Sequence, residues 1–247
     1  ITIHTRAIIG VNLYGQMCDT TELKRICNEN KLYFIEDAAQ SHGAKQGDLN
    51  VGDNSIAAAY SFYPGKNLGA WGDGGMVTTN SINLYKKILK IRNFGSKEKH
   101  IHEIKGVNTR LQPIQGILLK EKLKYIEEWN YERKTTANKY LDAFSDIDNL
   151  GLPKTFKENK HVWHLFVIEI SSRNKFINYC SKNNIETGIH YPFPIIKQQS
   201  YKSHFQKNEV FEESFSQHKK LVSLPIFPKM TQKEINYLIK IVRKYFT

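Results

Sequence analysis

The sequence predicts an α/β fold in which a mainly parallel sheet is flanked by helices and a smaller α/β domain follows at the C-terminal end. Over the first 80 residues, short apolar runs alternate with segments of helical periodicity. This alternation is typical of parallel strands joined by crossover helices. The pattern resets after Leu152-Pro153. We therefore expect a large domain over residues 1–135 and a small domain over residues 136–247.

The period of the apolar positions predicts the individual elements. In the first domain we expect strands over residues 7–13, 32–37, 57–62 and 76–79, and helices over residues 20–30, 82–93 and 114–140. The polar and basic stretch 95–108 is expected to be an exposed loop. In the second domain we expect a strand over 162–170, a helix over 174–183 and a last helix over 231–245, with Thr231 as its N-cap.

Length and composition limit the class of protein. The chain has 247 residues, 40% of them hydrophobic, which is enough for a sizeable core. It has no run of about 18 uncharged apolar residues and no signal-like start, so we expect a cytoplasmic protein without a membrane span. The three cysteines, Cys18, Cys27 and Cys180, form no C-x-x-C pair, which argues against a disulfide framework and a zinc site.

The net charge of +12 is spread along the chain. No DNA- or RNA-binding motif accompanies it, so phosphorylated small molecules are as good a target for this charge as nucleic acid. The cluster Lys97, Lys99, His100, His102 and Lys105 is compatible with phosphate binding, although such a charged segment is usually only solvated. His161 and His164 are three apart on an expected strand and would face opposite sides, which argues against a shared metal ion.

Lys66 follows the expected strand 57–62, at the position where ligands gather in parallel sheets. It lies in a Pro-Gly-Lys-Asn turn and is followed closely by four glycines, Gly69, Gly72, Gly74 and Gly75. The turn is not a P-loop, because Asn67 replaces the required Ser or Thr. A lysine considered alone is usually a solvated surface group. The surrounding residues must therefore decide its role.

Asp37 and Ser61 also stand at expected strand ends. Asp37 is either the N-cap of a short helix or a carboxylate that acts together with Lys66. Pyridoxal-phosphate (PLP) chemistry requires both a lysine that forms a Schiff base and a carboxylate beside the pyridine nitrogen. Ser61 is either an ordinary turn residue or a hydroxyl donor to the cofactor phosphate.

Several segments, taken in order, resemble the DegT/DnrJ nucleotide-sugar aminotransferases over nearly the whole chain. These segments are Val11-Asn12-Leu13-Tyr14-Gly15-Gln16, residues 35–44, residues 61–75, Gly106-Val107-Asn108-Thr109-Arg110-Leu111, Trp129-Asn130 with Arg133, His161-Val162-Trp163-His164, Gly188-Ile189-His190-Tyr191-Pro192 and Ser223-Leu224-Pro225. One such motif is weak evidence, whereas eight in order are strong. The resemblance implies a fold-type I PLP-dependent transferase that works as a homodimer with active sites at the interface.

The resemblance also implies a role for each site residue. Lys66 would be the Schiff-base lysine and proton carrier, and Asp37 would face the pyridine nitrogen. Gln40 would meet the ring hydroxyl, and Ser61 would hold the phosphate. Asn108 would reach the phosphate of the cofactor in the partner subunit.

The form Tyr63-Pro64-Gly65-Lys66 with His190-Tyr191-Pro192 looks most like the branch that aminates C3 of a dTDP-linked 3-keto-6-deoxyhexose with glutamate as donor. Tyr63, His190 and Tyr191 would then line the hexose pocket. Two departures accompany this resemblance. Ile196 stands where the family commonly has a histidine. Family members also carry further chain upstream, with a phosphate-binding loop and a ring-stacking aromatic residue, so we expect this chain to be N-terminally truncated.

Two other functions are compatible with the resemblance. The dehydratase branch of the family replaces the lysine with histidine, which Lys66 disfavours. A PLP-binding sensor or another non-transaminating member would use the same fold without turnover. Loss of Lys66 or Asp37 would indicate such a protein, and both residues are present.

Overall fold

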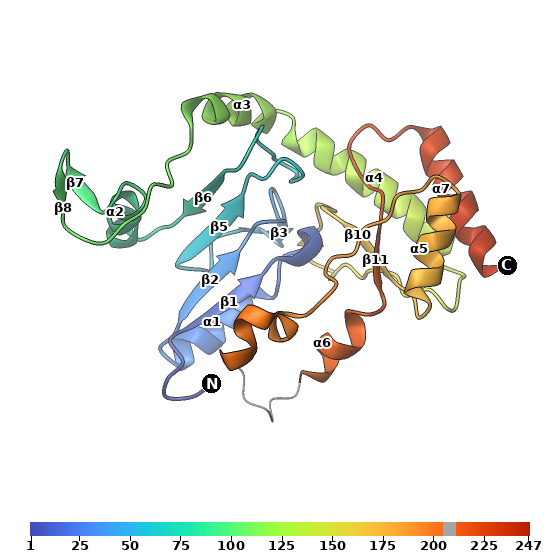
Figure 1. Cartoon of the computed structure of the whole chain (residues 1–247), viewed down its shortest axis with the longest axis horizontal. Helices are drawn as coiled ribbons and strands as arrows, with labels where there is room; N and C mark the ends of the chain where they lie inside the picture. The colour runs from blue at the N-terminus through green and yellow to red at the C-terminus, as the bar shows by residue number, and fades with distance from the viewer. Residues whose placement is uncertain (205–210) are drawn as a thin grey trace. The chain divides into compact units, whose positions relative to one another are not determined.

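The computed structural model describes residues 1–204 and 211–247. The chain divides into two compact units (Figure 1). The first unit comprises Ile1–Tyr131 with Phe156–His164, and the second comprises Glu132–Thr155 with Leu165–Thr247. Within the described residues, no helix has both the length and the apolar character needed to cross a bilayer.

The first unit is built on a four-stranded sheet with the order β1-β2-β5-β6 (Figure 1). Strands β1 (Ala7–Val11), β2 (Tyr33–Asp37) and β5 (Ala57–Ser61) are parallel, whereas β6 (Gly75–Thr78) is antiparallel to β5. The four predicted strands and the mainly parallel sheet are thus confirmed. One part of the prediction is wrong. The crossover from β2 to β5 contains the small strands β3 (Lys45–Gln46) and β4 (Leu49–Asn50) instead of a helix.

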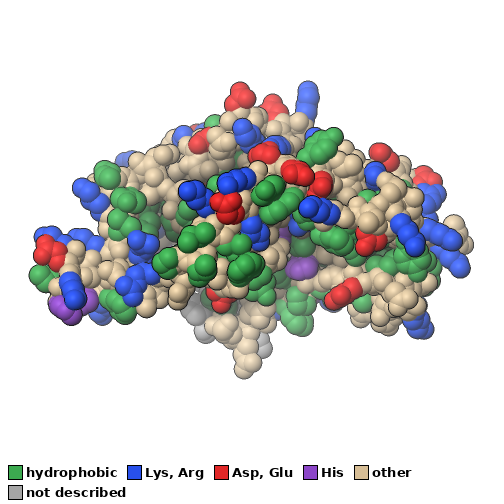
Figure 2. All heavy atoms as spheres, turned by 90° about the horizontal axis from the view of Figure 1, so that it is seen from above, with side chains coloured by type: hydrophobic (Ala, Val, Ile, Leu, Met, Phe, Trp, Pro, Cys, Tyr) green, Lys and Arg blue, Asp and Glu red, His purple; other side chains and the backbone are tan. Residues whose placement is uncertain are grey.

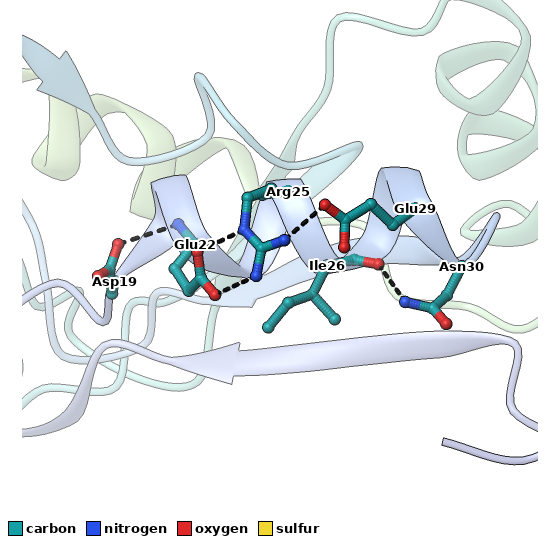
Figure 3. A network of polar contacts seen from close by, with 6 residues as sticks. All are labelled: Asp19, Glu22, Arg25, Ile26, Glu29 and Asn30. Atoms are coloured by element: carbon teal, nitrogen blue, oxygen red, sulfur yellow. Dashed lines mark hydrogen bonds and ion pairs between the residues drawn. The ribbon is translucent and has the colours of Figure 1, made fainter.

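Helix α1 (Thr20–Glu29) joins β1 to β2, as predicted. Asp19 caps its N-terminus by accepting from the Glu22 backbone N–H, and Arg25 bridges Glu22 and Glu29 on the exposed side (Figure 3). On the inner side, a Cβ added to Gly10 of β1 would lie 2.8 Å from Cys18 Sγ and 2.9 Å from Leu23 Cδ1. Because Gly10 has no side chain, Leu23 of α1 and Cys18 in the segment before it can pack closely on the sheet.

Glu36 of β2 is a fully buried carboxylate on the α1 side of the sheet. Its Oε2 accepts from Asn12 Nδ2 (2.9 Å), and its Oε1 accepts from the Gly52 backbone N–H (2.9 Å) and from Ser55 Oγ (2.8 Å). Three donors from two separate loops replace the water that the carboxylate loses on burial. Glu36 therefore ties these loops to β2.

The segment 95–108, predicted to be a loop, instead holds the hairpin of β7 (Ser96–Glu98) and β8 (Ile101–His102). It follows α2 (Ile82–Ile91), which starts at the predicted residue. The tight turn has His100 at φ 69°, and Glu103 pairs with Lys90 and with Lys97 (3.5 Å). Both faces of the hairpin are largely exposed, so no apolar alternation in the sequence marked it as a strand pair.

The prediction of a single helix over residues 114–140 is also wrong. The structure has two helices, α3 (Pro113–Leu123) and α4 (Ile126–Phe144). Between them the backbone N–H groups of Lys124 and Tyr125 donate to the carbonyls three residues earlier, of Glu121 and Lys122. Such a tight turn changes the direction of the chain without disturbing the helical spacing of apolar residues. The periodicity therefore continued across the break.

The strand predicted over residues 162–170 is shorter in the structure. Only β10 (Phe166–Glu169) is a strand within that range, and β9 (Asn159–Lys160) pairs with β3 just before it. Residues 161–164 are irregular, with Trp163 at φ 47°, so the argument that His161 and His164 face opposite sides of a strand does not apply. This segment belongs to the first unit.

In the second unit, β10 pairs antiparallel with β11 (Leu221–Leu224). The sheet packs with the end of α4, and the buried rings of Tyr140 and Phe166 meet edge to face at 5.2 Å between centroids. The further helices are α5 (Arg173–Lys182), η2 (Ile195–Lys197), η3 (Gln199–His204), α6 (Glu212–Gln217) and α7 (Gln232–Phe246). Thr231 caps α7 in a capping box with Glu234, as predicted.

The Glu36 contacts lead to a stability prediction. In Glu36→Gln, the new amide nitrogen takes the place of Oε2 and faces the donor Nδ2 of Asn12. The Asn12 amide cannot flip to offer its oxygen instead, because its Oδ1 accepts from the Cys18 backbone N–H (3.0 Å). We expect a loss of about 2 kcal/mol of stability, measured as a lowered thermal midpoint of the full-length protein. The matched control is Glu128→Gln on the exposed face of α4. Equal midpoints for the two variants would contradict the prediction.

Candidate active site

Asp37 and Ser61 lie on the same face of the sheet. Asp37 pairs in register with Ala59 of β5, and Ser61 is two residues further along that strand. Because side chains alternate along a strand, Asp37, Ala59 and Ser61 share the face opposite α1. They line a shallow pocket of ≈ 390 Å³ together with Ile9, Ile35, Glu36, Ala39 and Tyr60. The pocket has an apolar floor with polar groups at the carboxyl ends of β2 and β5.

No helix follows Asp37, so the N-cap interpretation is wrong. Residues 38–40 form a turn, and Asp37 Oδ1 accepts from the backbone N–H of Ala39 (3.0 Å). Ser61 Oγ accepts from the backbone N–H of Tyr63 (3.2 Å), which makes Ser61 a turn residue. Its hydroxyl hydrogen is not used in that bond and can be donated to an oxyanion. Both side chains are therefore held in place by the turns that follow their strands.

Lys66 lies in a closed turn that runs from Phe62 to Ala70. The backbone N–H of Ala70 donates to Phe62 O (2.8 Å), and that of Lys66 donates to Tyr63 O (2.9 Å). A Cβ added to Gly69 would lie 2.3 Å from Pro64 O, so the turn can close only with glycine there.

Helix α3 supports the same turn from its other side. Lys122 Nζ donates to Gly69 O, and Gln115 Oε1 accepts from the backbone N–H of Trp71 (2.8 Å). The backbone around Lys66 is therefore fixed by bonds within the turn and by bonds to a neighbouring helix.

The Lys66 amine is half-buried. Burial lowers its pKa below the ordinary lysine value, and the negative charge of Asp37 opposes this effect. A lysine with a lowered pKa holds more neutral amine at a given pH, and neutral amine is the nucleophilic form. Lys66 therefore has the electrostatic environment of a reactive lysine.

Gln40 is buried in the turn after β2. Its Oε1 accepts from the backbone N–H of Tyr14 at 2.6 Å, and Tyr14 and Gly15 both have positive φ, 59° and 109°. The bond assigns the orientation of the amide, since only the oxygen can accept from an N–H group. Nε2, a donor, therefore points away from Tyr14.

His42 lies in the motif of residues 35–44 but was not among the predicted site residues. It is 4% exposed, and its ring lies 5.4 Å from the Tyr60 ring and 6.0 Å from the Phe62 ring, between centroids. Neither ring nitrogen has a side-chain hydrogen-bond partner among the described residues. Burial and the positive charge of Lys66 lower the pKa of His42 to about 4, so the imidazole is neutral at pH 7.

Four further residues were predicted for the site. Tyr63 is 59% exposed and lies in the same turn as Lys66. Asn108 is exposed after β8, and its Oδ1 accepts from Arg110 Nε (3.1 Å). His190 and Tyr191 belong to the second unit, where His190 Nδ1 lies 2.8 Å from Ser223 Oγ. The roles of these four residues stay predictions.

On the face shown in Figure 2, the basic side chains do not form one separate patch. Lys and Arg side chains are distributed over the face shown in Figure 2, with Asp and Glu side chains between them. Across the part of the chain that the structure describes, no three His, Cys, Asp or Glu side chains are grouped so that they could hold a metal ion. Lys66, Asp37, Gln40 and Ser61 stay the candidate residues of the site, and their roles are predictions as well.

Known proteins share this arrangement of strands and turns. A sequence profile of the DegT/DnrJ/EryC1/StrS aminotransferase family matches residues 1–243. The chain belongs to this family. It is 42% identical over 245 residues to the dTDP-3-amino-3,6-dideoxy-alpha-D-galactopyranose transaminase of Aneurinibacillus thermoaerophilus, covering 99% of this chain and 67% of that protein.

Two crystal structures give the same result. The chain superposes on DesV of S. venezuelae with a TM-score of 0.96 at 36% identity, covering 99% of this chain and 66% of DesV. It superposes on NtdA of Bacillus subtilis, which has the cofactor PMP bound, with a TM-score of 0.89 at 26% identity, covering 100% of this chain and 57% of NtdA. The predicted α/β fold of a fold-type I PLP-dependent transferase is confirmed. The chain spans 65% of the length of several curated relatives that it matches.

The low pKa of His42 leads to a prediction on pH dependence. A histidine that is neutral when folded stabilises the fold fully above its unfolded pKa of about 6.5, and this stability is lost as the pH falls from 6.5 towards 4. At pH 5 the loss is about 2 kcal/mol. We therefore expect the thermal midpoint of His42→Phe to fall less between pH 7 and pH 5 than the thermal midpoint of the wild-type protein.

The control for this measurement is His100→Phe in the exposed hairpin. His161, whose pKa burial also lowers to about 4, contributes a second part of the acid sensitivity that both variants retain. The same pH dependence in His42→Phe and in the control would contradict the assignment of a neutral His42.

Proposed function

We propose that this protein is a PLP-dependent aminotransferase that converts a keto nucleotide sugar to the amino sugar, with glutamate as amino donor. The observation that carries the proposal is the gathering of Lys66, Asp37, Gln40 and Ser61 at the carboxyl ends of neighbouring strands. Family membership supports the reaction class. We further propose that residues 1–135 form the cofactor domain and residues 136–247 the small domain.

The residues present fit PLP. The pocket on the sheet face has a flat apolar floor for an aromatic ring, with an acceptor at Asp37 and a donor at Ser61. Asp37 would hold a proton on the pyridine nitrogen, Gln40 would donate to the ring hydroxyl through Nε2, and Ser61 would donate to a phosphate oxygen. When bound, the cofactor supplies an electron sink for the substrate carbanion.

Lys66 performs two tasks in this proposal. Its Nζ would hold the cofactor until the amino donor displaces it, and the neutral amine, once released, would take a proton from the reacting carbon and pass it on. The lowered pKa of Lys66 favours this task, because a protonated amine cannot accept a proton. The negative charge of Asp37 raises the pKa of Lys66, so the protonated amine would remain available to give the proton back.

The narrower part of the proposal concerns the substrate. The relative from A. thermoaerophilus is named as a transaminase of a dTDP-linked 3-amino sugar, which supports a dTDP-3-keto-6-deoxyhexose substrate. Tyr63, His190 and Tyr191 would line the hexose pocket. We also propose a cytoplasmic homodimer in which Asn108 reaches the phosphate of the partner subunit's cofactor. A sensor without turnover is disfavoured, since Lys66 and Asp37 are both retained.

The role of Lys66 can be tested by chemical trapping. In the full-length protein loaded with PLP and reduced with borohydride, we expect the pyridoxyl group on the peptide that contains Lys66. Lys66→Ala should lose both the label and more than about 1000-fold in rate, as expected when a nucleophile is removed. Lys86→Ala, on the exposed side of α2, is the control and should keep both. Label on another lysine, or no label, would refute the assignment.

The choice of substrate can be tested with keto nucleotide sugars. We expect kcat/KM, followed as 2-oxoglutarate released from glutamate, to be at least about 100-fold higher for a dTDP-3-keto sugar than for its 4-keto isomer. Unreacted dTDP-glucose serves as the blank. Equal values for the two isomers would remove the C3 assignment and leave the aminotransferase assignment standing.

A further inference from the structure

Asn67, the residue directly after Lys66, uses its whole side-chain amide in buried hydrogen bonds. Its Nδ2 donates to Asn130 Oδ1 (2.8 Å) and to Val162 O (2.9 Å), and its Oδ1 lies 3.0 Å from His164 Nδ1. Asn67 is 5% exposed and Asn130 is 3% exposed. Three segments distant in sequence therefore meet at one amide beside the reactive lysine.

The direction of each bond in this group is determined. Val162 O can only accept, so the nitrogen of the Asn67 amide must face it. Asn130 Nδ2 donates to His42 O (2.9 Å), so Asn130 Oδ1 is the acceptor for Asn67. The remaining atom, Asn67 Oδ1, can only accept, and His164 must therefore carry its proton on Nδ1. No other orientation of the two amides satisfies both backbone carbonyls.

The same group connects the Lys66 turn to the turns around Gln40. Val162, which accepts from Asn67, donates its backbone N–H to Gly15 O (2.9 Å). The residue before Gly15 is Tyr14, whose backbone N–H donates to Gln40 Oε1. Asn130, the other partner of Asn67, donates to the backbone carbonyl of His42, which is two residues after Gln40. The position of Lys66 is thus linked to the position of Gln40 through hydrogen bonds on both sides.

The packing around the group leaves little room for adjustment. A Cβ added to Gly15 would lie 2.8 Å from the backbone nitrogen of His164 and 3.0 Å from that of Trp163. A Cβ added to Gly43 would lie 3.0 Å from Asn130 Nδ2. If the Asn67 amide lost its bonds, these segments could shift only together, since they are in close contact.

We propose that Asn67 is a positioning residue, which fixes the Lys66 amine relative to Asp37 and Gln40 by tying the Lys66 turn to Asn130, Val162 and His164. This inference rests on the proposed function of Lys66. A residue with only a structural role would affect stability alone. A positioning residue also changes the proton equilibrium of the lysine-bound cofactor and the rate of proton transfer, while substrate affinity stays nearly the same.

The decisive variant is Asn67→Asp in the full-length protein loaded with PLP. It keeps the shape of the side chain but removes both donors, and it places a carboxylate against Val162 O and Asn130 Oδ1. We expect the pH midpoint of the cofactor absorbance to shift by at least about one unit. We also expect kcat to fall about 100-fold, with KM within about threefold, as for a small displacement of a reacting group. Asn80→Asp, exposed before α2, introduces the same charge and is the control.

A pair of variants at His164 provides the second measurement if Asn67→Asp does not fold. In His164→Asn, the side-chain nitrogen takes the place of Nδ1 and can still donate to Asn67 Oδ1, whereas His164→Leu leaves that oxygen without a donor. We expect His164→Leu to shift the absorbance midpoint and lower kcat, and His164→Asn to have a smaller effect on both. Thermal midpoints of the cofactor-free proteins separate loss of stability from loss of positioning.

The outcomes separate this inference from the proposed function. An absorbance midpoint and kcat for Asn67→Asp equal to those of Asn80→Asp would overturn the positioning role and leave the proposed function intact. A rise in KM without a change in kcat would also overturn it, because it would place Asn67 in substrate binding. Absence of pyridoxyl label on Lys66 in the wild-type protein would overturn both proposals.

Discussion

The parallel pairing of β2 with β5 is the constraint on which the site depends. The register places Asp37 beside Ala59, and the alternation of side chains then puts Ser61 on the same face. A slip of one residue would turn Asp37 towards α1 and remove the carboxylate from the pocket. Lys66 follows only five positions after Ser61, so its place is also determined by this pairing. One strand pair thus supplies the acceptor, the hydroxyl and the start of the lysine turn.

Glu36 and Asp37 are adjacent carboxylates with opposite surroundings, and Glu36 protects the register. Glu36 is fully buried and accepts three hydrogen bonds on the α1 side, whereas Asp37 is partly exposed on the pocket side. Exchanging the two faces would withdraw the Glu36 carboxylate from Asn12 and Ser55 and break their hydrogen bonds to it. The negative charge of Glu36 adds to burial in raising the pKa of Cys18 to about 11 and that of Tyr60 to about 12. Both side chains therefore stay neutral near the sheet.

The sequence was sufficient for features that depend on neighbouring residues. The strands around Asp37 and Ser61 and the cap at Thr231 follow from local periodicity and side-chain type, and the motif around Lys66 was continuous enough to resemble a family. Contacts between distant segments were not predictable in this way. Asn67 and Asn130 are 63 residues apart, and Asn67 and His164 are 97 apart. Residues 161–164 follow an irregular path where Val162 and His164 contact Asn67, whereas their apolar pattern alone suggested a strand.

The proposed role of Lys66 as a base sets two requirements that oppose each other, and the structure is compatible with both. An amine that reacts as a base must be partly removed from water so that its pKa falls, yet it must remain accessible to a substrate. Half-burial of Lys66 satisfies the first requirement without full enclosure, and the charge of Asp37 limits the fall. A protonated His42 would add a positive charge close to Lys66 and lower its pKa further. Burial of the imidazole between Tyr60 and Phe62 keeps it neutral, so the electrostatic balance at Lys66 is set by its burial and by the carboxylate.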